Sequence, residues 1–514
     1  MNRRRATPAA VLAVVSFGVF IAADDLTVVS TMLREIIGDL EIPLPDDFDR
    51  AAWIVNSYLV AYVAVMPFMG RLSDLLGRRT VFVGSLVVFL AGSIWIPFTD
   101  SLGPFIAGRV LTALGGGAMV PVALAAIGDV YREGRRTRPF GVLGAIDTIG
   151  WVWGPLFGAM LVRFLNWRWQ FYLNIPLALL CIVAAWWALG GLDRPARRSR
   201  IDWWGAAALS AGLVALNVAL LDTGRISSVE ELADLTGDRD PTTWPLFLVA
   251  AAAFVVFVAV ERRSADPLVD LGLFRRDDFS PAMAVNFLVG AVLIVAMVDI
   301  PLFVNLAVET DLERAAVLSG LVLSALTATM AVFSWAGGVA TPRFGRRAVV
   351  AWGVAVTAGG FLLMGLTWDA GTGPGTMAWQ GAILGIGFGL VTAPLHDAAV
   401  SAAPPDRRGT AGGLVILARL MGLAVGLSGL TAWAIYRFES LRGTLDLPPI
   451  DSEGYGAAVE AAQAELSAGA LGETFLAAAV VAFAAVGVAL VLHPVRGDAA
   501  AASATEVGTS DTGG

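Results

Sequence analysis

The sequence predicts an all-α integral membrane protein with about fourteen spanning helices and both termini in the cytoplasm. Three observations lead to this prediction: repeated apolar runs, an uneven distribution of arginines, and a loop motif that occurs twice. Apolar residues make up 57% of the 514 positions and charged residues 15%, whereas a soluble domain carries about a quarter charged residues. The composition therefore favours a chain that lies mostly in lipid.

The apolar runs have the length that a membrane helix requires. A helix rises about 1.5 Å per residue, so about twenty residues cross a hydrocarbon core of about 30 Å. Backbone groups in lipid must bond within their own segment, so these runs are expected to be helical. The predicted spans are 9–31, 51–70, 79–98, 104–128, 138–162, 170–190, 203–221, 244–260, 280–305, 315–340, 347–367, 377–402, 410–436 and 472–492.

Arginine gives these spans an orientation. The chain has no lysine, and when the spans alternate from the N-terminus, 24 of the 35 arginines fall on the N-terminal side. Nine fall on the other side, and Arg109 and Arg419 fall within spans. Basic residues concentrate in cytoplasmic loops, so both termini are predicted to be cytoplasmic. The first apolar run resembles a signal peptide but continues into Asp24 and Asp25 without a small-residue cleavage site, so it is interpreted as the first span.

Charge and cysteine content exclude other classes. The net charge of -8 does not suggest nucleic-acid binding, and the single Cys181 excludes an internal disulfide. Two histidines are too few for a histidine-rich metal site, and no nucleotide-binding loop is present. No cofactor or metal is expected, and a membrane enzyme is disfavoured.

The longest outer segment and the tail differ from the spans. Residues 437–471 contain a Pro-Pro pair and then an Ala/Glu-rich stretch that favours helix. This segment is either a solvated linker or an ordered extracytoplasmic extension of the flanking helices. The tail 496–514 is rich in Ala, Ser, Thr and Gly and is predicted to be a disordered cytoplasmic tail.

A loop motif follows the second span. Residues 70–79 read GRLSDLLGRR. Its glycines allow close helix approach and a tight turn, its acid can pair with arginine or cap a helix N-terminus, and its basic pair suits the anionic inner leaflet. The motif residues are Gly70, Asp74, Gly77, Arg78 and Arg79.

A faded copy of the motif divides the chain into halves. Residues 338–347 read GVATPRFGRR, with the same glycine spacing and terminal arginines, and with Pro342 where Asp74 stands. Both copies follow an even-numbered span. Such repeats build many transporters, with the substrate site between the halves. The predicted organisation is a six-helix bundle in 1–192, two inserted helices and linkers in 193–278, and a second six-helix bundle in 279–495.

These motifs resemble the signatures of the major facilitator superfamily. GWVWGPLFG at 150–158 resembles its antiporter motif, whose residues here are Gly150, Gly154, Pro155 and Gly158. Arg109 matches the superfamily's intramembrane arginine, with Thr112 where the family has glutamine. The stretch WRWQFYLNIP at 167–176 resembles the start of the sixth span in the fourteen-helix drug:proton antiporters. The resemblance implies two six-helix bundles joined by two additional helices.

A closer resemblance is to the mycobacterial triacylglyceride exporters, which have also been described as multidrug efflux pumps and work with a periplasmic lipoprotein. The matching stretches run from Trp53 through Pro67, over the loop motif, at Ala418-Arg419, and from Ala432 to Phe438. The elongated segment before the last span is also similar.

Each charge inside a span needs an explanation, because an unpaired buried charge costs several kcal/mol. Adjacent helical residues point about 100° apart, so only one of Asp24 and Asp25 is expected to face a central cavity. The resemblance favours Asp25 as a proton-coupling residue; the alternative is a hydrated acid near the outer surface. Arg109 is either a cation that tunes a neighbouring acid or a structural ion pair or snorkelling side chain.

Further charges lie in later spans. Asp147 could be a second protonatable site or the partner of Arg109. Arg419 is predicted to face the cavity and to pair across helices with an acid such as Asp25 or Asp147. Asp299 is a cavity candidate in the second half. His396 and Asp397 are expected to be hydrated at the inner end of their span.

Three aromatic residues of the fifth span, Trp151, Trp153 and Phe157, could line an apolar cavity. Packing or lipid contact explains each of them equally well.

The sequence therefore predicts a proton-coupled exporter of hydrophobic or amphipathic compounds, either lipids or drugs, by alternating access. A non-transporting receptor or scaffold and uptake of a small solute are the alternatives. The predicted partners are membrane lipids, a hydrophobic substrate and an extracytoplasmic lipoprotein, with no nucleic acid. The protein is expected to be a monomer in the cytoplasmic membrane.

Overall fold

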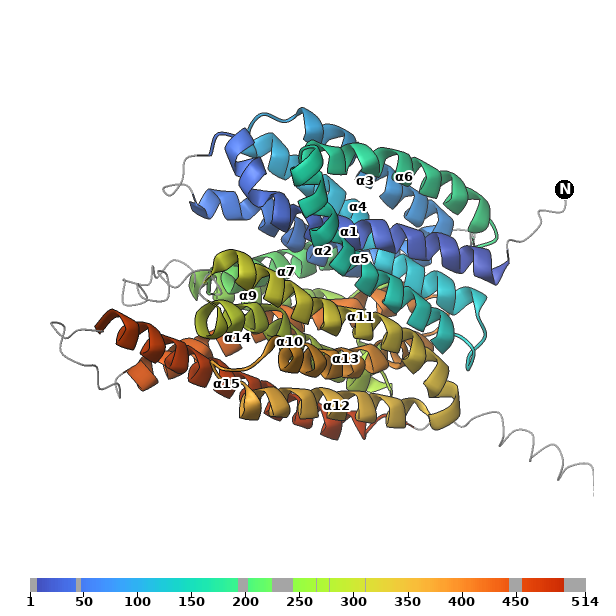
Figure 1. Cartoon of the computed structure of the whole chain (residues 1–514). Helices are drawn as coiled ribbons and strands as arrows, with labels where there is room; N and C mark the ends of the chain where they lie inside the picture. The colour runs from blue at the N-terminus through green and yellow to red at the C-terminus, as the bar shows by residue number, and fades with distance from the viewer. Residues whose placement is uncertain are drawn as a thin grey trace, which may run out of the picture.

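The computed structural model describes residues 7–42, 48–192, 202–223, 244–264, 266–276, 278–309, 311–442 and 455–493. These ranges contain fourteen helices that are long and apolar enough to cross a membrane, which confirms the predicted span number. Figure 1 shows them as two stacked bundles, with blue-to-green helices in one and yellow-to-red helices in the other. The predicted tail 496–514 lies outside the described residues.

Each bundle contains six membrane helices. The first bundle consists of α1 (Pro8–Asp39), α2 (Phe48–Leu76), α3 (Arg78–Trp95), α4 (Leu102–Val130), α5 (Thr137–Phe164) and α6 (Arg168–Ala188). The second consists of α10 (Phe279–Phe303), α11 (Leu312–Phe344), α12 (Arg346–Thr367), α13 (Pro374–Ala402), α14 (Arg408–Arg442) and α15 (Tyr455–Ala489).

Two inserted helices, α7 (Trp203–Thr223) and α9 (Trp244–Glu261), pack against each other, and α7 contacts both bundles. The Ser210 hydroxyl of α7 donates a hydrogen bond to the Ala64 carbonyl of α2 at 3.1 Å. The Ser428 hydroxyl of α14 donates to the Leu220 carbonyl of α7, also at 3.1 Å. Helix α7 therefore spans the line along which α2 meets α14, and α9 packs on α7.

The loop motif and its copy form the same turn. Gly77 has φ +95° between α2 and α3, and Gly345 has φ +84° between α11 and α12. A residue with a Cβ is strained at positive φ, whereas glycine is not. The repeated glycine thus ends an even-numbered helix and starts the next one in both halves, as the sequence repeat indicates.

Three apolar cores hold the bundles together. One lies wholly within the first bundle and includes Met32, Phe105 and Trp167. A second lies within the second bundle and includes Phe361 and Phe475. The third and largest joins residues of α1 to α6 with residues of α13 and α14. Apolar burial therefore links the halves as well as stabilising each one.

Helices α14 and α15 extend into the predicted outer segment. They cover 437–442 and 455–471, and Figure 1 shows the red end of α15 reaching beyond the bundles. Arg437 of α14 forms an ion pair with Glu473 of α15. Residues 443–454 between them lie outside the described residues.

Candidate functional site

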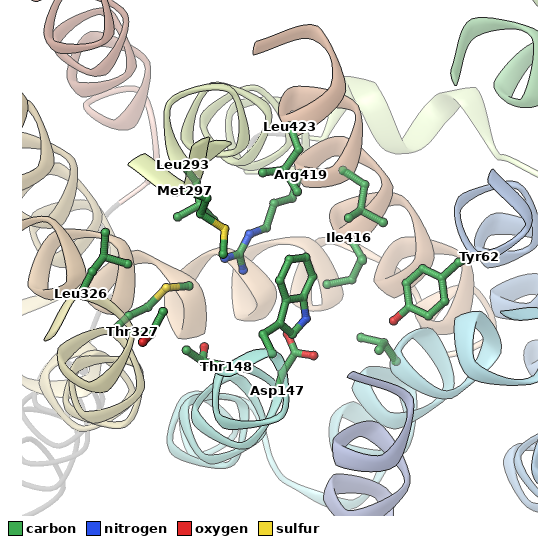
Figure 2. A pocket seen from close by; sticks show the side chains of 14 residues that line it. Tyr62, Asp147, Thr148, Leu293, Met297, Leu326, Thr327, Ile416, Arg419 and Leu423 are labelled. Atoms are coloured by element: carbon green, nitrogen blue, oxygen red, sulfur yellow. The ribbon is translucent and has the colours of Figure 1, made fainter. Parts of the chain in front are cut away.

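A small cavity lies between the two bundles. It holds about 50 Å³ and takes residues from α2, α4 and α5 on one side and from α10, α11 and α14 on the other. Its lining is mainly apolar, and Figure 2 shows the side chains converging on it. The lining residues are Tyr62, Val120, Asp147, Thr148, Trp151, Leu293, Met297, Leu326, Thr327, Met330, Ile416, Arg419, Leu420 and Leu423.

Two opposite charges face this cavity from different halves. Asp147 comes from α5 and Arg419 from α14, and Figure 2 shows the two side chains on opposite sides of the space. No ion pair within 4.0 Å joins them among the ion pairs of the described residues. The sequence predicted that Arg419 pairs across helices with an acid such as Asp25 or Asp147. Asp147 is the acid that faces Arg419 across the cavity, but the two side chains do not form an ion pair. Trp151, also proposed from the sequence, lines the same cavity.

Asp25 and Arg109 instead pair inside the first bundle. Arg109 Nη1 lies 3.0 Å from Asp25 Oδ2, and both side chains are fully buried. The guanidinium stacks over the Tyr58 ring at 4.3 Å, and Asn174 Nδ2 donates to Asp25 Oδ1 at 3.1 Å. Arg109 therefore does not snorkel to an interface. Hydrogen bonds from both sides hold the Asp25 carboxylate in place.

Contrary to expectation, neither acid of α1 lines the central cavity. Asp24 accepts a hydrogen bond from Gln170 Nε2 at 2.8 Å, and its other oxygen is buried with no partner in the described part of the chain. The reason is that α6 and α4 supply donors within the bundle. Gln170 and Asn174 lie one helical turn apart in the 167–176 stretch, so both amides project from the same face of α6. This shared face is the sequence signal that could have identified them as donors to Asp24 and Asp25.

Two other predicted residues lie apart from the cavity. Asp299 in α10 is 5% exposed, and its Oδ2 has no hydrogen-bond partner among the described residues. Trp153 is 46% exposed and stacks on Phe157 with ring centroids 5.8 Å apart. Trp153 and Phe157 therefore pack on each other and do not line the cavity, in agreement with the alternative of packing or lipid contact.

The loop motif joins the halves at the predicted cytoplasmic end. Asp74 accepts hydrogen bonds from the backbone N–H groups of Gly409 and Thr410, each at 2.9 Å, and from the Thr410 hydroxyl at 3.1 Å. These are the first residues of α14, so Asp74 caps a helix of the other half. Gly70 and Gly409 allow this approach, since a Cβ on Gly409 would lie 2.1 Å from the Gly70 carbonyl oxygen.

Arg78 continues this network. It binds Asp74 at 2.6 Å within the first half and Asp129 of α4 at 3.0 Å. Asp129 in turn binds Arg408 of α14 at 3.0 Å. The other basic residue of the motif, Arg79, stacks over Trp186 at 4.4 Å.

The second half repeats the arginine–aspartate part of the network. Arg346 binds Asp397 of α13 at 2.9 Å, and Asp397 lies 51 residues after Arg346, as Asp129 lies 51 after Arg78. Asp397 also lies 3.6 Å from Arg136, which precedes α5 of the first half. Burial lowers the pKa of the Arg136 guanidinium, and the charge of Asp397 opposes that shift. Each half therefore presents an aspartate to an arginine of the other.

Asp397 and its neighbour His396 are each 4% exposed. Phe140 of α5 packs on His396, so that ring is not hydrated at the inner end of the span as expected, whereas Asp397 borders an open hollow there. The sequence did not show this burial, since it depends on which helix of the other half covers α13.

The antiporter motif sets the contact between α5 and α1. A Cβ on Gly154 would lie 2.9 Å from the Asp24 carbonyl oxygen, and one on Gly158 would lie 2.8 Å from that of Val28. Gly150 similarly faces Ala23 at 2.7 Å. Pro155 lies within the helix, where it removes a backbone donor. Small residues thus bring α5, which carries Asp147, against α1, which carries Asp25.

This arrangement defines a transporter rather than an enzyme. Two similar bundles enclose a cavity between them, ion networks join them at one end, and buried charges lie where the halves meet. A search with family models matches residues 15–427 to the Major Facilitator Superfamily. The chain belongs to this superfamily of membrane transporters.

Similar proteins include lipid and drug transporters. The chain is 32% identical over 447 residues to a triacylglyceride transporter of Mycolicibacterium hassiacum, covering 85% of this chain and 81% of the relative. It is 30% identical over 414 residues to multidrug resistance protein 3 of Bacillus subtilis, covering 80% and 76%.

Solved structures share the fold. The human organic anion transporter TETRAN superposes with a TM-score of 0.62 at 15% identity, covering 94% of this chain and 99% of that one. A proton:xylose symporter gives a TM-score of 0.56 at 14% identity, covering 92% and 94%.

Proposed function

We propose that this transporter is a proton-coupled exporter of hydrophobic or amphipathic compounds, and that it works by alternating access in the cytoplasmic membrane. The observation that carries the proposal is the placement of Asp147 and Arg419 at a cavity between the two halves. Both groups can respond to charge in the cavity, and they belong to different bundles.

Protonation of Asp147 would change how strongly the halves attract each other. Two opposite unit charges about 4 to 8 Å apart attract by about 2 to 4 kcal/mol at an effective dielectric of about 20. A proton on the carboxylate removes this attraction. Protonation can drive a conformational change only if it alters the relative stability of the two states, and a carboxylate facing an arginine of the other half meets that requirement.

The ion networks stabilise one of the two conformations that alternating access requires. Contacts of Asp74, Asp129 and Asp397 with the opposite half close the predicted cytoplasmic end. Rocking the halves must break these contacts, so they stabilise the conformation in which substrate does not reach the cytoplasm. The buried Asp25–Arg109 pair is proposed as a further proton-coupling site, because α1 and α5 pack closely through the antiporter motif.

The substrate is proposed to be a lipid or an amphipathic drug. The described lining of the cavity is apolar except for Tyr62, Asp147, Thr148, Thr327 and Arg419. At about 50 Å³ the cavity is smaller than such a substrate, so the halves must separate around it. The names of the relatives, which include triacylglyceride transporters and a multidrug resistance protein, support this substrate class.

The test is gradient-driven transport in proteoliposomes. With an acidic interior, molecules whose cytoplasmic face is outside should accumulate ethidium or a fluorescent triacylglyceride analogue, and a protonophore should abolish accumulation. Asp147→Asn should retain exchange without a gradient and lose accumulation. Full accumulation by Asp147→Asn, or wild-type accumulation that survives the protonophore, would overturn the proposal.

Lipid and drug substrates can be separated through the outer segment. The outer segment favours lipid export, because an elongated segment before the last span is also a trait of the triacylglyceride exporters that the sequence resembles, and α14 and α15 extend into it. Deleting 445–468 should reduce export of the triacylglyceride analogue more than export of ethidium. An equal loss for both probes would favour a general drug exporter.

A further inference from the structure

His396 lies between the central cavity and the ion network at the predicted cytoplasmic end. It is 4% exposed in α13, and its Nδ1 is buried without a hydrogen-bond partner in the described structure. Its ring packs edge-on against Phe140 of α5, with centroids 6.4 Å apart. A buried imidazole at the boundary between two moving halves, with one ring nitrogen unsatisfied, is not explained by packing alone.

Polar groups lead from the cavity to this histidine. Thr148 lines the cavity, and one turn further along α5 a Cβ on Gly144 would touch both Ser334 of α11 and Thr392 of α13. Thr392 is one turn from His396 on α13. We call Thr148, Ser334, Thr392 and His396 the polar seam. All four are at most 6% exposed.

The hydroxyl groups of the seam retain the ability to accept hydrogen bonds. The Thr148 hydroxyl donates to the Gly144 carbonyl at 2.8 Å, and the Ser334 hydroxyl donates to the Gly141 carbonyl at 3.2 Å. Each hydroxyl oxygen also has two acceptor sites. The seam is therefore a line of groups that can hold a proton-carrying water chain when the halves separate.

The seam ends at a polar chamber. Asp397 follows His396 directly, and with Glu133, Asp278 and Ser401 it lines a hollow of about 720 Å³ at the predicted cytoplasmic end. Arg136, which contacts Asp397, lies one turn before Phe140 on α5. Residues on one face of α5 and one face of α13 thus lead from the cavity to the chamber, and His396 lies along this path.

Several charges surround the inner half of α13, and the guanidinium of Arg419 is close enough to act on His396 electrostatically. In the described structure the charged and titratable side chains on the neighbouring elements include Glu133 and Arg136 before α5, Arg276 and Asp278 before α10, Asp129 of α4, Asp147 of α5, Arg346 of α12, and Arg408 and Arg419 of α14. The positive charge of Arg419 and the burial of the ring both oppose a positive charge on His396, so the imidazole is neutral in this closely packed conformation. It can take up a proton only transiently, when the halves separate and water enters between them.

We propose that His396 is the proton-transfer residue between Asp147 and the cytoplasmic chamber, an inference that rests on the proposed proton coupling. A proton leaves the carboxyl group of Asp147, which becomes a carboxylate facing Arg419. It reaches one ring nitrogen of His396, which becomes imidazolium, and the other nitrogen releases a proton to water in the chamber. The close packing of the polar seam blocks this route in the present conformation and prevents a proton leak.

The experiment compares His396→Gln with wild type in proteoliposomes that contain a pH-sensitive dye. Gln keeps hydrogen-bonding groups but cannot carry a proton. We expect His396→Gln to retain ethidium exchange in the absence of a gradient, and to lose ethidium-driven proton movement at least tenfold. The control Asp100→Asn removes a titratable side chain that is 95% exposed and lies outside the seam and the chamber, and it should leave proton movement unchanged.

The outcomes separate the two proposals. Proton movement by His396→Gln within twofold of wild type would overturn the role of His396 and leave proton coupling intact. Loss of both exchange and proton movement would show that the residue is structural, which also overturns the inference. If wild type itself moves no protons with ethidium, the proposed function fails and the role of His396 fails with it.

Discussion

Replacing Asp74 with asparagine should open the predicted cytoplasmic end. Its ion pair with Arg78 lies within the first half, so it should persist when the halves separate and contribute little to the difference between the two conformations. The contacts that break on opening are those to the N–H groups of Gly409 and Thr410 and to the Thr410 hydroxyl. Asparagine offers one acceptor oxygen and no charge.

The magnitude follows from these bonds. Losing one charge-assisted hydrogen bond costs about 1.5 to 3 kcal/mol, and losing a negative charge at a helix N-terminus costs about 0.3 to 1 kcal/mol more. The closed state should therefore lose about 2 to 4 kcal/mol relative to the open state. Since about 1.4 kcal/mol corresponds to a factor of ten, the population ratio should shift by about 30- to 1,000-fold.

The assay is a spin-label distance across the two halves. Labels at Arg135→Cys and Arg343→Cys, both exposed positions of opposite halves, report opening in a Cys181→Ala background. Asp74→Asn should lengthen the main distance. The control Glu133→Gln removes an acid at the same end whose side chain is 76% exposed, and it should leave the distances unchanged. Identical distance distributions for Asp74→Asn and its parent would refute the reasoning.

Three other substitutions test the packing and the site. Gly409→Ala should lower the unfolding temperature in detergent, because its Cβ would lie 2.1 Å from the carbonyl oxygen of the facing glycine and overpacking costs about 1 to 3 kcal/mol; Gly429→Ala, which meets no heavy atom within 4 Å, is the control and should melt like wild type. Arg109→Met should destabilise the protein by about 3 to 5 kcal/mol in chemical unfolding, since it leaves its partner carboxylate buried without a counter-charge, and a loss below about 1 kcal/mol would contradict the paired assignment. Trp151→Ala should raise the substrate concentration for half-maximal transport at least threefold while Trp153→Ala does not, and the reverse order would exclude the cavity described above.

Much of the fold could be predicted because lipid imposes simple rules on sequence. The apolar runs gave the number of spans, and the glycine spacing in 70–79 and 338–347 gave the repeat, since Gly77 and Gly345 adopt the same positive φ. The charges inside spans identified Asp147 and Arg419, and the antiporter motif contains Trp151; all three line one cavity. These features depend on local sequence and on the period of the helix.

The remaining features depend on which helices pack together. Asp25 turns toward Arg109 because α4 lies beside α1, and Asp397 is buried because α5 covers α13. Neither arrangement can be derived from the residues of one span. The sequence analysis missed the pairing of Asp129 with Arg408 for the same reason. A signal for Asp129 was present, because it follows Arg78 by the same number of residues as Asp397 follows Arg346.

Proton release on substrate binding tests the central claim most directly. When purified protein in weakly buffered detergent receives a saturating concentration of ethidium, wild type should release protons, and Asp147→Asn should release fewer while still binding the dye. Wild-type binding without proton release, or equal release by Asp147→Asn, would contradict the account.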